Sequence, residues 1–183
     1  MKTWITSDLH LGHARIMEFC PESRSRFNGD VGFMNEAMVR EWNELIAPGD
    51  LVYLLGDVAF LSAAKTNAYL RRMHGDKILI EGNHDNKLVL DKEFRAEFKS
   101  IHQYLEITHA GHKIVMSHYP FLEWNQMGRG ALHFYGHKHG GACPEIAKYR
   151  ARDMGMDATG VIAMTLEDAI KDALTGEIKS HNS

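Results

Sequence analysis

The sequence predicts an α/β fold whose sheet system contains both parallel and antiparallel strands. Short apolar segments alternate with amphipathic segments through the first half of the chain, which favours helices packed on a parallel sheet. Residues 51–55 form a nearly continuous apolar run, as is typical of a strand that is buried on both faces. Two β-prone segments flank Ala110 and Gly111, and this pattern predicts a hairpin that makes the sheet system mixed.

The first elements along the chain show the alternation. Residues 4–6 are β-prone, so we expect a short first strand there. Residues 34–46 are predicted to form a helix, which a Pro-Gly pair ends. The residues that share its apolar face at helical spacing are Met34, Met38, Trp42 and Leu45. The apolar run 51–55 then forms the second strand.

The later elements continue this pattern and then change it. Ser62 is a candidate N-cap for a helix over 62–73, and a strand over 77–80 follows. Residues 87–98 are predicted to be helical. The remaining predicted elements are hairpin strands over 104–108 and 113–117, a strand over 131–135, and a helix over 166–174 that Thr165 caps.

Composition indicates a single globular domain over residues 1–178 with a polar C-terminal tail at 179–183. The chain has 183 residues, 44% of them hydrophobic and 25% charged, with a net charge of −3. A slightly acidic chain is not typical of a protein that coats nucleic acid or anchors to membranes through basic residues. Two cysteines do not form a disulfide framework, and no signal peptide or membrane span is evident. We therefore expect a cytoplasmic protein.

Residues that can bind metals follow the predicted strands at five separate strand ends. In open α/β sheets, ligands bind at the carboxyl ends of the strands, because loops that are distant in sequence converge there. Four of the five groups also contain a glycine, which permits a sharp turn. The groups are Asp8 with His10, Asp57, Asn83 with His84 and Asp85, His118, and His137 with His139.

The donor set favours two divalent metal ions over one. Two carboxylates, one amide oxygen and four imidazoles are too many ligands for a closed tetrahedral zinc site. They suit a pair of ions that share a bridging carboxylate. Mixed oxygen and nitrogen ligands accept Mn, Fe, Ni, Co or Zn. The absence of cysteine from the set argues against a structural zinc site or an iron–sulfur cluster.

The order of these motifs resembles that of the calcineurin-like metallophosphoesterases. The motifs are Asp8-x-His10, Gly56-Asp57, Gly82-Asn83-His84-Asp85, Ser117-His118 and Gly136-His137-x-His139, and residues 152–157 look like a late segment of a compact microbial and phage-borne branch. The resemblance implies two mixed β-sheets that pack face to face between helices. It also implies two divalent metal ions, with manganese favoured.

The resemblance implies a role for each of these residues. Asp57 would bridge the two ions, His84 would face the scissile phosphate, and Asp85 would orient His84. The first ion would be held by Asp8, His10 and His139, and the second by Asn83, His118 and His137.

Two positions depart from the pattern of many relatives. Phe60 stands where an acidic or amide residue is common, and Lys138 lies between the two histidines of the last motif. Lys138, His13 and Arg129 are candidate contacts to the substrate. Aromatic residues of the loop 119–129 would either stack on a base or cap the core, and we favour the core.

The predicted function is hydrolysis of a phosphate ester by a hydroxide that bridges two metal ions. A phosphodiester such as a nucleotide or cyclic nucleotide is favoured, and a phosphomonoester is the alternative. Nuclease activity is less favoured, because the chain has no insertion that would cap DNA and no basic track. A non-catalytic metal-binding scaffold would lack ligands that are present here. The expected partner is a small phosphate ester or a nucleic-acid end, with no membrane and no obligate protein partner.

Overall fold

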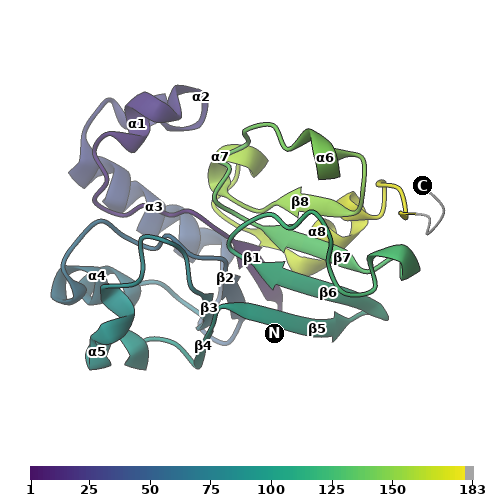
Figure 1. Ribbon diagram of the computed structural model, residues 1–183. Coiled ribbons are helices and arrows are strands. Elements are labelled where there is room, and N and C mark those ends of the chain that lie inside the picture. Colours follow the sequence, from purple (N-terminus) through teal and green to yellow (C-terminus); the bar gives the residue numbers. More distant parts are fainter. Residues whose placement is uncertain (180–183) are drawn as a thin grey trace.

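The computed structural model describes residues 1–179, in which two β-sheets pack against each other and helices flank them (Figure 1). The first sheet has the strand order β4-β3-β2-β1-β9, and the second has the order β5-β6-β7-β8. Each sheet contains parallel and antiparallel pairs. The predicted fold class, an α/β fold with two packed mixed sheets, is thereby confirmed.

The first sheet is parallel except at one edge. Strands β1 to β4 run parallel, and β9 joins β1 in antiparallel orientation. In the second sheet β5 and β6 form the predicted hairpin, whereas β7 and β8 add in parallel. The strands are β1 Thr3–Thr6, β2 Leu51–Leu54, β3 Asp76–Ile80, β4 Ser100–His102, β5 Tyr104–His109, β6 His112–Ser117, β7 Leu132–Tyr135, β8 Ala151–Asp153 and β9 Met164–Thr165.

The helices are mostly short. The α-helices are α1 Ile16–Phe19, α2 Pro21–Arg24, α3 Val31–Leu45, α4 Ala63–Leu70, α5 Lys92–Ala96, α6 Pro144–Ala147, α7 Met156–Thr159 and α8 Leu166–Ala173, and the 3₁₀ turns are η1 Ser25–Phe27, η2 Leu88–Leu90 and η3 Met127–Arg129. Among residues 1–179, no helix is both long and apolar enough to cross a membrane.

Alternation of side chains along the strands gives the first sheet two buried faces. Ile5 and Ile80 point towards the second sheet and pack with Phe134 and with α8. Trp4 and Leu54 point the other way, into a core that α3 completes. The near-continuous apolar run at β2 is explained by this double burial.

Helix α3 shows where the sequence pattern was right and where it was wrong. Met34, Met38 and Trp42 are buried, but Leu45 is 45% exposed at the last turn, and Ile46 packs into the core in its place. The helix begins at Asp30, whose carboxylate accepts a hydrogen bond from the backbone N–H of Phe33.

Two other predicted features differ from the structure. The helix predicted over 87–98 is broken into η2 and α5, because Asp91 leaves the helical conformation and caps α5 through the N–H of Phe94. Ser62 precedes α4 but makes no side-chain cap bond, whereas Thr165 caps α8 as predicted. Lys179 of the predicted polar tail pairs with Glu123, and positions 180–183 lie outside the described residues.

Candidate metal centre

The loops that follow β1, β2, β3, β6 and β7 converge at one edge of the two sheets. Backbone hydrogen bonds join the first two loops, since Asp8 N–H donates to the carbonyl of Gly56 and His10 N–H donates to that of Asp57. The N–H of His137 donates to the Asp8 carboxylate at 2.9 Å, which ties in the loop after β7. All seven predicted metal ligands therefore come from this edge.

The backbone is strained at these positions. In the described chain, eight residues other than glycine have a positive φ, and five of them are predicted ligands, namely Asp8, His10, Asp57, His137 and His139. Such conformations cost about 1–3 kcal/mol each and concentrate at functional sites. The fold therefore holds these five residues in a backbone conformation that they would otherwise rarely adopt.

One group of three side chains can hold a cation. The nearest ligand atoms of Asp8, His10 and His139 lie within 4.8 Å of one another. The Oδ1 atom of Asp8 and both ring nitrogens of His10 are buried and lack a hydrogen-bond partner within the described chain. Buried polar atoms normally have partners, so these atoms fit an ion that would satisfy them.

A second group lies beside the first. Asp57, His118 and His137 also place ligand atoms within 4.8 Å of one another. Asn83 joins this group, because its Oδ1 lies 2.9 Å from Nε2 of His118.

Asp57 lies between the two groups and presents one oxygen to each. Its Oδ2 is 3.6 Å from Nε2 of His10, and its Oδ1 is 3.6 Å from Nε2 of His118. The carboxylate is almost completely buried, at 2% exposure. The carboxylate can therefore reach both groups of ligand atoms.

Hydrogen bonds orient two of the imidazoles. Nδ1 of His118 lies 2.7 Å from the carbonyl oxygen of Leu55, and Nδ1 of His139 lies 2.6 Å from Oδ2 of Asp157. Because an acceptor holds the proton at Nδ1, the lone pair at Nε2 faces the site.

The ionisation states of Asp8, His10 and His137 suit cation binding, whereas that of His139 opposes it until a cation displaces the proton. Burial lowers the pKa of His10 and His137, which keeps both rings neutral. Burial opposes ionisation of Asp8, but the nearby imidazoles of His10 and His139 hold its pKa below the usual value. Burial also opposes the charged form of His139, yet its bond to Asp157 raises the pKa of the ring.

His84 lies at the mouth of the site and is half exposed. Its backbone N–H donates to Oδ1 of Asp57 at 2.9 Å, and its ring contacts Phe60 at a centroid distance of 4.4 Å. Phe60 also stacks on His13 at 4.0 Å and on His10 at 5.2 Å. The residue that departs from the common pattern therefore packs against three histidines.

Asp85 does not orient His84 as the sequence suggested. Its buried carboxylate accepts hydrogen bonds of 2.8–2.9 Å from the N–H groups of Gly82, Asp57 and Val58. Burial raises the pKa of Asp85 to about 6 even though these donors favour the charged form. Asp85 joins the loop after β3 to the loop after β2, and it fixes the backbone of Asp57.

The sequence analysis missed a buried ion pair behind the site. Arg24 Nε donates to Asp157 Oδ1 at 2.7 Å, and both side chains are almost fully buried. The guanidinium also donates to the carbonyl oxygens of Asp8 and Leu9. Asp157 falls in the late segment 152–157, but nothing in the sequence marked Arg24.

The other three residues that were predicted to contact the substrate lie in different surroundings. His13 packs at the mouth against Phe60, and Lys138 is half-buried between its two histidines. Arg129 is exposed in η3, and within residues 1–179 its side chain makes no hydrogen bond to the site. The aromatic residues of the loop 119–129 divide between the two expectations: Trp124 is buried in the core and Phe121 packs partly buried against it, whereas Tyr119 is 48% exposed.

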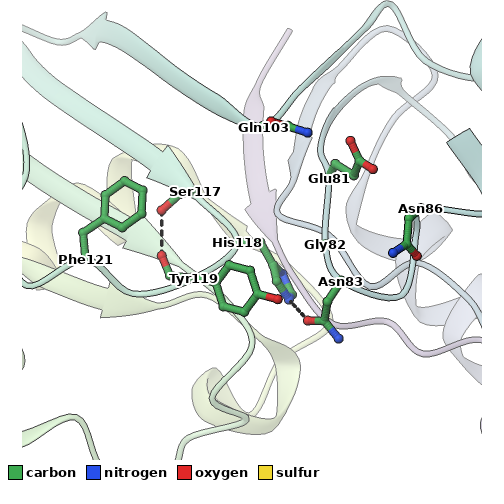
Figure 2. Close-up of a pocket in the computed structure, with 9 residues that line it drawn as sticks. All are labelled: Glu81, Gly82, Asn83, Asn86, Gln103, Ser117, His118, Tyr119 and Phe121. Atoms are coloured by element: carbon green, nitrogen blue, oxygen red, sulfur yellow. Dashed lines mark hydrogen bonds between the residues drawn. The ribbon is translucent and has the colours of Figure 1, made fainter.

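A pocket of about 350 Å³ opens beside the second group of ligands. Figure 2 shows aromatic rings on one side and polar side chains on the other. Its lining residues are Glu81, Gly82, Asn83, Asn86, Gln103, Ser117, His118, Tyr119 and Phe121.

The fold and these two groups of ligand side chains are typical of metal-dependent phosphoesterases. The chain belongs to the calcineurin-like phosphoesterase superfamily, because the model of that superfamily's domain matches residues 1–155. The family expected from the sequence motifs is thereby confirmed.

Individual relatives match over most of the chain. An uncharacterized protein of Methanocaldococcus jannaschii is 29% identical over 140 residues, which cover 75% of this chain and 69% of that protein. The gene 66 protein of Mycobacterium phage L5 is 25% identical over 167 residues, with coverage of 75% and 77%. The solved structure of a protein of unknown function from Aquifex aeolicus matches with a TM-score of 0.71 and 27% identity, covering 93% of this chain and 98% of that one.

Proposed function

We propose that this protein is a dinuclear metal-dependent phosphodiesterase. The observation that carries the proposal is the position of Asp57, whose two oxygens face His10 and His118 at the same distance of 3.6 Å. One buried carboxylate between two ligand groups fits a pair of ions better than a single ion.

Each group would hold one divalent ion, with Asp57 shared. Asp8, His10 and His139 would hold the first ion, and Asn83, His118 and His137 would hold the second. When bound, such a pair neutralises phosphoryl oxygens and lowers the pKa of water towards 7. Mixed imidazole, carboxylate and amide donors accept several divalent ions, and Mn²⁺ is the ion that the family resemblance favours.

His84 acts on the substrate rather than on the ions. Its exposed ring lies at the mouth of the site, where an N–H can donate to a phosphoryl oxygen or pass a proton to the leaving oxygen. Phe60 holds the ring from one side. Asp85 contributes indirectly, by fixing the backbone at Asp57.

The open site suits a small phosphodiester, such as a nucleotide or a cyclic nucleotide. His13, which stacks on Phe60 at the mouth, can serve as a further contact, and Lys138 is a candidate because it lies between His137 and His139 in the chain. Arg129 is exposed in η3, which argues against it as a contact.

Hydrolysis of bis-p-nitrophenyl phosphate beside p-nitrophenyl phosphate tests the proposal. We expect Mn²⁺-dependent turnover with preference for the diester. General acid catalysis contributes roughly 10²–10⁴-fold, so His84→Asn should retain more activity than Asp57→Asn. Equal loss in the two metal-loaded variants would contradict this ranking, and preference for the monoester would reassign the protein as a phosphatase.

A further inference from the structure

The pocket beside Asn83 and His118 has two chemically different walls. Tyr119 and Phe121 follow β6 and supply one wall, whereas Glu81 and Asn86 come from the loop that follows β3 and supply the other (Figure 2). The pocket meets the candidate metal centre at Asn83 and His118. A group that is bonded to a phosphate at the centre can therefore extend into it.

The aromatic wall presents a rigid face. Tyr119 is 48% exposed, and its ring is held edge-on by His137 at a centroid distance of 4.6 Å and by His118 at 5.2 Å. Phe121 stacks on His133 behind it. An exposed ring that neighbouring rings immobilise suits stacking against another flat group.

The polar wall offers hydrogen-bonding groups that nothing else uses. The side chains of Glu81, Asn86 and Gln103 make no hydrogen bond within residues 1–179. Two amides can donate and accept, and the carboxylate of Glu81 accepts only.

The charge of the pocket is the feature that discriminates between ligands. No lysine or arginine occurs among the lining residues, and Glu81 is the single charged side chain among them. A second phosphate or a carboxylate in this pocket would face Glu81, with no lysine or arginine among the lining residues to pair with it. An uncharged group with N–H or O–H donors would pair with it.

We infer that this pocket binds the organic group of the phosphate ester, and that it selects an uncharged, flat, hydrogen-bond-donating group such as a nucleoside over a group that carries a second anion. The inference rests on the proposed function and adds a rule of substrate selection. Tyr119 supplies the stacking face, Gln103 and Asn86 bind the edge of the group, and Glu81 rejects anions.

Three p-nitrophenyl diesters that share one leaving group test this rule. The second ester group on the phosphate is methyl in the first compound, thymidine linked through its 5′ oxygen in the second, and the same thymidine with an added 3′-phosphate in the third. We expect kcat/KM to be highest for the thymidine ester and at least about tenfold lower when the 3′-phosphate is present. Tyr119→Ala should lower the thymidine-to-methyl ratio by roughly 10–100-fold, which is the scale of one base–aromatic stack.

The ratio of kcat/KM for the thymidine ester to kcat/KM for the ester with the 3′-phosphate should fall by about tenfold in Glu81→Gln, because this substitution removes the repulsive charge. Glu145→Gln removes an exposed charge from α6, outside the pocket lining, and is the matched control that should leave this ratio as it is. Equal kcat/KM for the two thymidine esters in the wild type, or an equal shift in both Glu variants, would overturn the inference.

A binding measurement separates this inference from the proposed esterase activity. Titration with thymidine should shift the side-chain NH₂ signals of Asn86 and Gln103 in NMR spectra, and Tyr119→Ala should weaken the binding. If the methyl ester is not hydrolysed while thymidine still binds there, the esterase proposal fails and the pocket assignment stands. Hydrolysis of the methyl ester without thymidine binding overturns the pocket assignment alone.

Discussion

Replacing Asp157 with asparagine tests how the fold supports His139. The Asp157 carboxylate accepts from Arg24 Nε at 2.7 Å and Nη2 at 2.9 Å, and it lies 2.6 Å from Nδ1 of His139. An asparagine has one acceptor oxygen, so its NH₂ group must face either Arg24 or His139. One donor then meets another donor, and the charge of Arg24 loses its buried partner.

The loss of folding free energy in Asp157→Asn follows from the burial of this ion pair. Arg24 is 0% exposed and the Asp157 side chain is 1% exposed, so water cannot replace the lost partner. Removing one member of a buried pair costs about 3–5 kcal/mol. For a chain of this size, that free energy corresponds to a fall in Tm of roughly 10 °C. We expect metal affinity at the first group to fall by about 10–100-fold as well, because His139 loses the acceptor that sets its tautomer.

Urea unfolding of the wild type, Asp157→Asn, Arg24→Met and the double variant measures the loss of stability, and calorimetric titration with Mn²⁺ measures the loss of metal affinity. The double variant should lose less than the sum of the single losses, since the two side chains act on each other. A loss below about 1 kcal/mol in Asp157→Asn, or additive losses, would refute the reasoning.

Three further predictions follow from the same contacts. Burial lowers the pKa of His133 to about 4, so His133 is protonated in the unfolded chain at a higher pH than in the folded one. The free energy of unfolding should therefore fall by up to about 3 kcal/mol as pH drops from 6.5 towards 4. Urea unfolding should show this loss in the wild type and not in His133→Gln. Gly136→Ala would place a Cβ 2.5 Å from Oδ2 of Asp8, so calorimetry should show weakened metal binding, and unchanged binding would contradict this. Phe60→Ala should lower kcat more than it changes metal content, because it frees the ring of His84, and an unaltered kcat would contradict the contact.

The location of the site could be predicted because it depends on topology. The parallel strands β1, β2 and β3 bring their carboxyl ends to one edge, so Asp8, Asp57 and Asn83, which follow these strands, must lie close together. Elements with clear periodicity, such as α3, were likewise predicted well. Leu45 was misplaced because a helical pattern cannot show where the sheet beneath the helix ends.

Other features depend on contacts that no local pattern encodes. Arg24 pairs with a residue 133 positions away, and Asp85 bonds to backbone groups rather than to the neighbouring His84 ring. The helix break at Asp91 arises because one side chain can cap a new helix as well as continue an old one. The short strands β4, β8 and β9 have too few residues for an alternating pattern to emerge.

The metal content of the purified protein, after removal and saturation with Mn²⁺, tests the central claim most directly. The wild type should bind two ions per chain. Asp57→Asn should lose at least one of them, whereas His84→Asn should keep both, because only Asp57 lies between the two ligand groups. A single ion or none in the wild type, or two tightly bound ions in Asp57→Asn, would contradict a site built on a shared carboxylate.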